Sequence, residues 1–446
     1  MAGWSTTRRV LIAATLLSVL TASACALDTE EAVVEQTQTG TSPRSVQCAA
    51  PVTLPGDGLT IQVINRSSYS CDKVHVFVQQ GSPSPPTTVY APTTLDKQSS
   101  WKVQKIASGA VVISLGDASV EPPPKAAPSP DTSAIRFDQI ELSYSGDAKY
   151  PSQQSADMTS VQMFGIPLDM TTRDSSGQIQ DSRVWRCYTD KIKSSLKTAM
   201  TNAGGDYSRA VRQDSQGNFL RLVSPNITSG LNPSGYPDFK DYVSSIVGQP
   251  LTLVSRPDSP VKYHYTGAFK TIAGKTSITL HDGTTKDSNG NLANKNITID
   301  AATLPSNDGM SGGAGTTNAI YSINGPYYLG DDGKDGPHFV AENDVHAAAY
   351  RDLIAGFDWG FWGSQNSAVK GNDSSKFVVS DSNAFASAQP SKPYYNIWAA
   401  ALFPYTDSYG FPFADTFNPN RNPLLPLPVG GTLQITIQPD TGPSTC

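Results

Sequence analysis

The chain is poor in charge. Of its 446 residues 16% are charged, and no run rich in lysine and arginine occurs. Because nucleic acids and anionic membrane surfaces are recognised by clustered basic side chains, we expect neither as a partner. The formal net charge is −6. The first 24 residues carry two arginines and no acid, so the rest of the chain is more acidic still. This balance leaves neutral and cationic ligands open.

Histidine and cysteine are also scarce, with five of each, and no Cys-x-x-Cys spacing occurs. A zinc site is therefore not expected. Two Asp-rich turns, at residues 287–291 and 331–336, resemble fragments of calcium loops but lack the terminal glutamate of an EF-hand loop. The sequence thus predicts neither a metal site nor a cofactor.

Long apolar runs are absent beyond the N-terminus, which excludes a multispanning membrane protein. Residues 1–24 have the features of a secretory signal peptide: two arginines, a short apolar core over 10–20, and small residues at the end. Cys25 follows directly. Lipidation of Cys25, ordinary cleavage nearby and twin-arginine export all remain open. We expect a protein that is secreted, or lipid-anchored at the bacterial cell surface or periplasm, and that meets a membrane only through Cys25.

Residues 25–47 are acidic, rich in Thr and Gln, and without periodicity, which predicts a flexible tether. Four cysteines remain after it, and an exported chain with an even number favours disulfides. Four cysteines allow three pairings. Because Cys48 and Cys446 bracket the globular region, we favour a Cys48–Cys446 bridge, with Cys71–Cys187 as the second.

Apolar and polar residues alternate through much of the first third, which is typical of half-buried strands. The predicted strands are 59–63, 73–78, 110–115, 135–144 and 161–168. From about residue 186 the pattern changes to helical spacing, with Ile192, Leu196 and Met200 four apart. Further segments predict helices over 239–247, 339–354 and 394–402, short strands over 251–254, 277–280 and 296–299, a hairpin tip over 282–294, and a last strand over 432–437.

The simplest architecture is mainly β plus α/β: a β-barrel or sandwich with a mixed α/β domain inserted before its last strand. Neither the sequence pattern nor the composition calls for an oligomer, and we expect a monomer. The expected organisation is a signal peptide (1–24), a tether (25–47), the first part of the β domain (48–185), the α/β domain (186–393), and a late helix with the closing strand (394–446).

One acid stands out on a predicted strand. In the segment F-D-Q-I-E-L-S-Y, one face carries Phe137, Gln139, Glu141 and Ser143. Glu141 lies among neutral polar residues, as a cleft-facing acid would, although a solvated sheet face has the same pattern. Aromatic residues are frequent in the second half of the chain. Rings that carry a polar group suit partly solvated surfaces such as sugar-binding grooves, and they also occur in the protein core.

Several segments, taken in order, resemble one family. They are the strand pair 59–78, the strand S-G-A-V-V-I-S-L-G at 108–116, F-D-Q-I-E-L-S-Y at 137–144, V-Q-M-F-G-I-P-L at 161–168, Y-N-I-W-A-A-A-L-F-P-Y at 395–405, and Y-G-F-P-F-A-D at 409–415. Together they are similar to glycoside hydrolase family 64, the β-1,3-glucanases that release laminaripentaose and share a thaumatin-like barrel. The resemblance implies a barrel and an α/β domain with a wide groove between them for a glucan chain.

The resemblance also implies an inverting mechanism, in which one carboxylic acid protonates the leaving oxygen and a carboxylate activates water. Glu141 matches the acid. The position of the base falls on Gln162, and glutamine cannot take a proton from water at neutral pH. Asp157 and Asp169 are then candidate substitute bases, or the groove binds glucan without cleaving it.

The same resemblance marks residues for substrate binding. Ser143 and Thr159 match polar positions near the two carboxylates. Tyr409 and Asp415 belong to the late signature, whose first acidic position is Ala414 here. The sequence thus leaves three hypotheses: an exported endo-β-1,3-glucanase, a catalytically degenerate β-1,3-glucan-binding protein of the same fold, and a structural or adhesion protein unrelated to sugar.

Overall fold

The structure is a computed structural model of the chain. It describes residues 47–442 except 53, 82–84, 126–127, 150–153, 229–234, 258, 260, 284–293, 301–318, 324, 332–335, 340–343, 370 and 419–421. The expected signal peptide, Cys25, nearly all of the tether and the hairpin tip lie outside the described residues. Among the residues that are described, no helix is long and apolar enough to cross a membrane.

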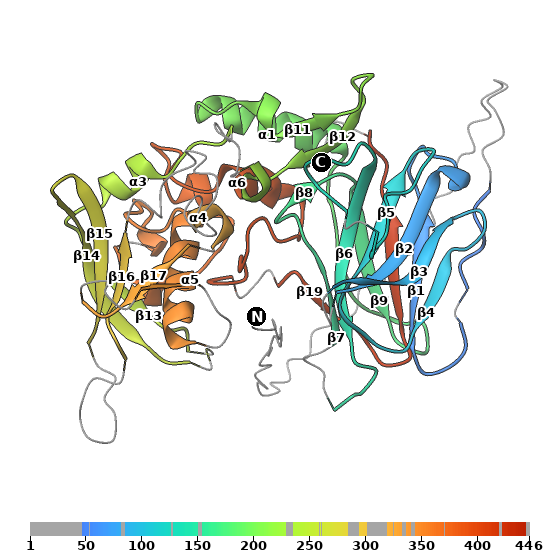
Figure 1. Ribbon diagram of the computed structural model, residues 1–446, viewed down its shortest axis with the longest axis horizontal. Helices are drawn as coiled ribbons and strands as arrows, with labels where there is room; N and C mark the ends of the chain where they lie inside the picture. The colour runs from blue at the N-terminus through green and yellow to red at the C-terminus, as the bar shows by residue number, and fades with distance from the viewer. Residues whose placement is uncertain are drawn as a thin grey trace, which may run out of the picture.

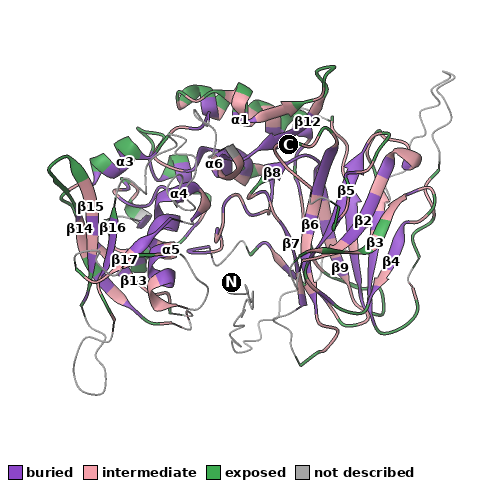
Figure 2. Cartoon of the chain, in the orientation of Figure 1, coloured by how far each residue is buried: buried purple, intermediate pink, exposed green. Residues whose placement is uncertain are grey.

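Two sheets pack face to face to form a sandwich, on the right in Figure 1. Their facing sides carry the buried aliphatic residues of each strand, which form one core (Figure 2). One sheet has the order β10 (Ile179–Arg183), β9 (Leu168–Arg173), β20 (Thr432–Ile437), β1 (Leu59–Asn65) and β4 (Ser100–Val103). The other has the order β19 (Leu424–Pro426), β7 (Gln154–Met158), β6 (Arg136–Tyr144), β5 (Ile106–Leu115), β2 (Val74–Gln80) and β3 (Thr87–Thr94).

The last strand, β20, lies between β1 and β9, and it runs parallel to β1 with Ile61 opposite Leu433. The chain therefore returns to the sandwich only at its end. Over the described strands, no pairing joins the two sheets, so the expected barrel-or-sandwich takes the form of a sandwich and a closed thaumatin-like barrel is not seen.

The second lobe, on the left in Figure 1, contains a six-stranded sheet and a buried helix. Helix α5 (Val345–Asp358) packs on this sheet through Phe357 against Phe269 and Tyr350 against Tyr327, with ring centroids 6.0 Å and 5.6 Å apart. The sheet order is β13 (Pro250–Val254), β14 (His264–Ile272), β15 (Lys275–Asp282), β16 (Ile297–Asp300), β17 (Tyr327–Leu329) and β18 (Pro337–His338).

A third layer, at the top of Figure 1, joins the lobes. It contains α1 (Thr189–Asn202), α6 (Ile397–Leu402) and a small sheet of β11 (Val211–Gln213), β12 (Phe219–Val223) and β8 (Met163–Phe164). Helix α1 buries Ile192, Leu196 and Met200, which confirms the spacing read from the sequence. The remaining helical segments are α2 (Pro225–Thr228), α3 (Lys240–Ser245), α4 (Ala319–Ser322), and the 3-10 turns η1 (Cys71–Lys73), η3 (Tyr207–Arg209), η5 (Ser367–Val369), η6 (Ser374–Lys376), η7 (Phe385–Ser387) and η8 (Phe403–Tyr405).

The predicted continuous strand over 161–168 is wrong. Only β8 and the first residue of β9 fall within it, and they belong to different sheets. Between them the chain turns at Gly165, where a Cβ would lie 2.1 Å from the carbonyl oxygen of Phe137. Pro167 has no N–H for a strand ladder. The short apolar run is therefore a crossing between sheets.

The predicted disulfides are also wrong. Cys48 is bonded to Cys71, with the Cα atoms 5.1 Å apart, because the chain that enters the sandwich passes beside η1. Cys187 is disulfide-bonded too, and its partner lies outside the described residues. Neither Cys48–Cys446 nor Cys71–Cys187 therefore exists.

Candidate active site

The outer face of strand β6 carries the acid singled out from the sequence. Along β6, Ile140, Leu142 and Tyr144 are buried in the sandwich core. Gln139, Glu141 and Ser143 alternate with them and are half-buried. The two faces expected from the sequence are confirmed, and Glu141 lies on the face that the sandwich does not use.

Strand β7 places a second carboxylate directly beside Glu141. In the antiparallel pairing of β6 with β7, Glu141 is opposite Asp157 and Ser143 is opposite Ser155. Side chains of directly opposed residues project from the same face, with Cβ atoms about 4.5–5.5 Å apart. Asp157 is 7% exposed, so this carboxylate lies well below the surface. The register of two neighbouring strands therefore creates a carboxylate pair.

The strand residues next to the pair on this face are neutral, and farther along it the Arg221 guanidinium lies 4.7 Å from the centroid of the Phe137 ring. On β5, Ala110 is opposite Glu141 and Val112 is opposite Gln139. Farther along, a small apolar cluster covers part of the face with the residues Phe77, Ala110, Val112, Val120, Phe137 and Met163. Ala110, the smallest of these neighbours, is itself buried in this cluster. Glu141 and Asp157 are thus the acids that this face of β5, β6 and β7 presents among the described residues.

A β-bulge lies next to the pair. The pairing of β5 with β6 shifts between Ile106 and Gly109, and Ser108 in between has a φ of 48°. The Ser108 N–H donates to the Ser143 hydroxyl at 3.0 Å. The Ser143 oxygen is thereby fixed while its own proton can be donated to another acceptor. Bulges of this kind aim side chains near functional sites.

We call the late segment 406–418 the floor loop. Its first residues lie beside the end of β7. Thr159 forms an isolated bridge with Tyr409, and the Ser160 N–H donates to the Tyr409 carbonyl at 2.8 Å. The hydroxyls of Ser160 and Ser408 are 2.9 Å apart, and Arg186 forms an ion pair with Asp407. The start of the loop is therefore fastened to the strand that carries Asp157.

The other end of the floor loop contacts the second lobe. The Arg351 guanidinium lies 4.9 Å from the centroid of the Phe413 ring, and Arg256 donates to the Asp415 carbonyl at 3.4 Å. Phe413 and Phe417 have φ values of 57° and 66°, a left-handed conformation that costs free energy for a bulky residue. Such a conformation persists only where surrounding contacts fix it.

Beside this end of the floor loop, Tyr263 donates a hydrogen bond to Asp352 on α5. Burial raises the pKa of Asp352 to about 6, although Tyr263 and two nearby arginines favour its charged form. The second lobe thus contributes cationic and aromatic side chains to its side of the floor loop.

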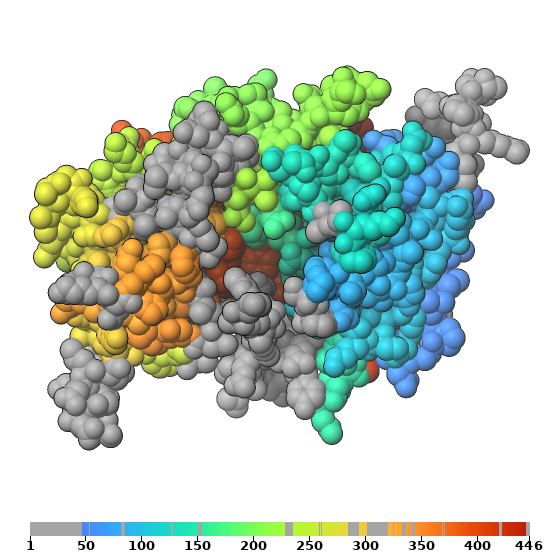
Figure 3. All heavy atoms as spheres, in the orientation of Figure 1, coloured from blue at the N-terminus to red at the C-terminus, as the bar shows by residue number. Residues whose placement is uncertain are grey.

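Figure 3 shows the surface hollowed between the two lobes, with dark red residues of the late chain at its bottom. The strands β6, β7 and β19 are the part of the sandwich nearest to the second lobe in Figure 1. Strands β6 and β7, which carry the pair, therefore lie on the side of the sandwich that faces the second lobe, and the floor loop runs from the end of β7 to that lobe. An extended ligand fits this arrangement better than a compact one.

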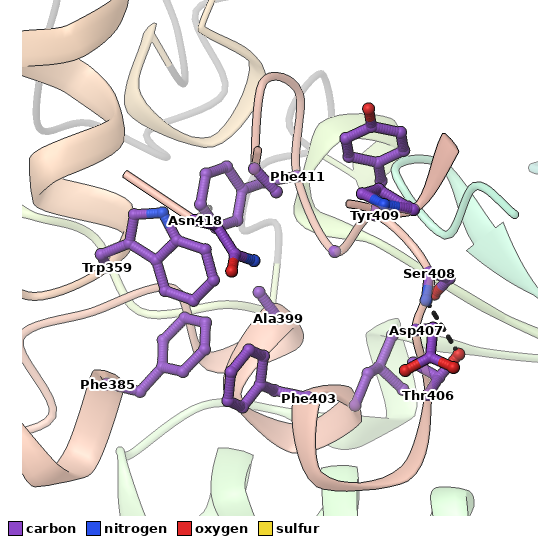
Figure 4. A pocket seen from close by; sticks show the side chains of 14 residues that line it. Trp359, Phe385, Ala399, Phe403, Thr406, Asp407, Ser408, Tyr409, Phe411 and Asn418 are labelled. Atoms are coloured by element: carbon purple, nitrogen blue, oxygen red, sulfur yellow. Dashed lines mark hydrogen bonds between the residues drawn. The ribbon is translucent and has the colours of Figure 1, made fainter. Parts of the chain in front are cut away.

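A small cavity lies beneath the floor loop (Figure 4). Its volume is about 20 Å³, which is room for one water molecule rather than a sugar. Trp359, Phe385 and Phe403 pack around it, and the ring of Tyr409 points away from them. This apolar cluster supports the floor loop and leaves Tyr409 directed elsewhere.

A profile of the β-1,3-glucanases of glycoside hydrolase family 64 matches residues 105–423. The chain belongs to this family. None of the curated proteins matches it.

Two solved structures of family 64 have a similar fold. One is a laminaripentaose-producing β-1,3-glucanase in complex with laminaritetraose. It is 16% identical, with a TM-score of 0.54 over 87% of this chain and 100% of the other. The second is a β-1,3-glucanase domain from Clostridium beijerinckii, 15% identical, with a TM-score of 0.51 over 86% of this chain and 100% of the other. At such identities the likeness shows the shared fold.

The structure of this family 64 chain separates the three candidate base positions. Asp157 lies opposite Glu141. Gln162 lies in an exposed bend before β8, five residues beyond Asp157, and its carbonyl accepts the Ser224 N–H at 2.9 Å. Asp169 belongs to β9 in the other sheet, where it accepts the Trp185 N–H at 2.7 Å. Gln162 and Asp169 are therefore not brought to the pair.

The four expected substrate-binding residues lie on two segments near the carboxylate pair of this family 64 chain. Ser143 lies on β6, and Thr159 directly follows β7. Tyr409 and Asp415 lie on the floor loop, which Thr159 contacts through Tyr409. The sequence analysis missed Gln79 of β2, which lies opposite Ala110 in the row that leads to Glu141. Alternation in β2 was visible in the sequence, but the order of the strands was not.

Proposed function

We propose that this protein is an exported β-1,3-glucan hydrolase in which Glu141 is the general acid and Asp157 the general base. The observation that carries this proposal is the cross-strand pairing of the two residues on the open face of the sandwich. The family membership supports a glucan substrate, and the hollow between the lobes suits an extended chain.

In this reaction Glu141 protonates the glycosidic oxygen of the leaving sugar, and Asp157 takes a proton from the water that attacks the anomeric carbon from the opposite side. The resemblance to family 64 implies that the configuration at that carbon is inverted, which requires the two carboxyl groups to diverge from their neighbouring Cβ atoms to about 6.5–9.5 Å so that the water fits between them. With Asp157 as the base, activity does not depend on Gln162, which supports hydrolysis over the alternative of a binding-only protein.

The neutral surroundings of the pair fit a neutral polysaccharide. Ser143, held by the Ser108 N–H, has a proton to donate to a sugar hydroxyl. Thr159 and Tyr409 extend the polar edge toward the floor loop, and Asp415 lies at its far end. Hydrogen bonds from several such groups orient a glucan without requiring charge on it.

The proposal is tested by measuring reducing ends released from laminarin and from a β-1,4-glucan. We expect release from laminarin alone. Glu141→Gln is expected to abolish release while retaining laminarin binding, whereas Glu121→Gln, an exposed glutamate in a loop, serves as the matched control. Absence of release by the wild-type protein, or undiminished release by Glu141→Gln, would refute the proposal.

A further inference from the structure

A second, larger cavity opens on the outside of the connecting layer, and we call it the α1 pocket. It has a volume of about 600 Å³, within the range of roughly 300–1,000 Å³ typical of ligand sites. One wall is a face of α1, the opposite wall is the segment 386–395, and residues of α6 and η8 form the base.

The α1 pocket is separate from the carboxylate pair. None of the expected catalytic or substrate-binding residues lines it. Ala399 of α6 lines the small cavity under the floor loop, whereas Ala400 and Ala401 of the same helix line this pocket, so α6 lies between them. A ligand in the α1 pocket would therefore leave the hollow between the lobes open.

The lining of the α1 pocket suits a polyhydroxylated ligand. Exposed side chains of Ser194, Thr198 and Asn202 follow one face of α1 and offer hydroxyl and amide groups. Tyr395 and Tyr405 contribute half-buried rings with phenolic hydroxyls. Such rings combine apolar contact area with a hydrogen-bonding tip, as recognition of a sugar requires.

The charges in the pocket decide between ligand classes. Lys191 and Lys392 are its ionisable cationic residues, both exposed, and no carboxylate lines it. Exposed lysines keep their ammonium groups in water, so these two residues do not make the pocket specific for an anion. The neutral donors and the rings make up the greater part of the surface a ligand would meet.

We propose that the α1 pocket is a second binding site for β-1,3-glucan, which holds the polysaccharide away from the carboxylate pair. This inference rests on the proposed function, because it assumes the same polymer as ligand. A polymer bound at two sites on one chain gains avidity without any new contact at the reacting centre. The benefit is therefore expected on long or insoluble glucan and not on short oligosaccharides.

The experiment blocks the pocket in the Glu141→Gln protein, in which cleavage does not consume the ligand. Ser194→Trp and, as a second variant, Thr198→Trp place a large ring in the pocket from α1. Lys197→Trp is the matched control, because Lys197 is exposed on the same helix but does not line the pocket. Laminaritetraose binding is followed by titration calorimetry, and retention is measured on insoluble β-1,3-glucan.

We expect two laminaritetraose sites per chain in Glu141→Gln and in the Lys197→Trp control, and one in each pocket variant. Retention on insoluble glucan should fall roughly tenfold or more in the pocket variants. This loss is smaller than the largest gain in avidity that two linked sites can give. Catalytically competent Ser194→Trp protein should hydrolyse short laminari-oligosaccharides at the wild-type rate.

A single site in Glu141→Gln, or two sites in both pocket variants, would overturn the inference. Binding of inorganic phosphate but not laminaritetraose to the pocket would overturn it as well, in favour of an anion site. These results differ from failure of the proposed function, which would appear as absence of hydrolysis by the wild-type protein.

Discussion

The assignment of Asp157 as general base leads to a sharp expectation for the variant Asp157→Asn. The substitution keeps the size of the side chain and removes its ability to take a proton. On the open face of β5, β6 and β7, the described neighbours of Asp157 are neutral except for Glu141. Among the described strand residues of this face, only Glu141 carries a second carboxylate, and it is already assigned as the acid.

The expected loss follows from the role of Asp157 as the base. General acid–base help contributes about 10²–10⁴-fold to a rate, which corresponds to about 3–5 kcal/mol of activation free energy. We expect kcat on laminarin to fall by this full factor in Asp157→Asn, with little change in laminarin affinity. Reducing-end release over time, with binding measured separately, gives both quantities.

Gln162 provides the discriminating comparison, because the resemblance read from the sequence puts the base there. Gln162→Asp and Gln162→Ala are expected to change kcat less than about twofold, as for a residue remote from the reacting atoms. If Asp157→Asn kept wild-type turnover, or if Gln162→Asp raised turnover by orders of magnitude, the register-based assignment would be wrong.

Three further predictions concern mechanism and stability. Proton NMR of early products should show the α-anomer first, since inversion of a β-linkage is expected; initial β-anomer would indicate retention. Cys48→Ala should lower the free energy of unfolding by about 3 kcal/mol in urea titrations, because the Cys48–Cys71 bridge closes a separation of 23 residues, and an unchanged midpoint would contradict this. Asp352 has a pKa raised to about 6 from 3.8, so its contribution to stability is lost as pH rises through that interval. The free energy of unfolding of Asp352→Asn, relative to that of the wild type, should therefore rise by about 2 kcal/mol between pH 4 and pH 7. This value is below the full effect of the pKa shift because Asp352 is partly exposed. Parallel pH–stability curves of the two proteins would count against the shift.

Local patterns in the sequence predicted much of the secondary structure. The alternation in β6 correctly gave the face of Glu141, and the four-residue spacing in α1 correctly gave its buried stripe. These succeed because burial on one face of a strand or helix follows directly from its repeat. The helix expected over 339–354 is α5, displaced toward the C-terminus because Asp344 caps it by accepting the His346 N–H.

Relations between distant segments could not be predicted in the same way. The pairing of Glu141 with Asp157 depends on strand register, and a shift of one residue would point Asp157 into the core. The run over 161–168 has the composition of a strand, yet the close approach of Gly165 to Phe137 turns the chain there. The disulfide pairing depends on which segments meet in space, and four cysteines leave three equally permitted answers.

The position of β20 has a consequence for how the molecule is made. Because this strand lies between β1 and β9, the sheet that contains them cannot be completed until residues 432–437 have been synthesised. During synthesis β1 and β9 each present an unpaired edge, and such edges invite association with other chains. Folding of the sandwich therefore requires residues 432–437, and a chain shortened before Thr432 should fail to form the sandwich rather than lose only one strand.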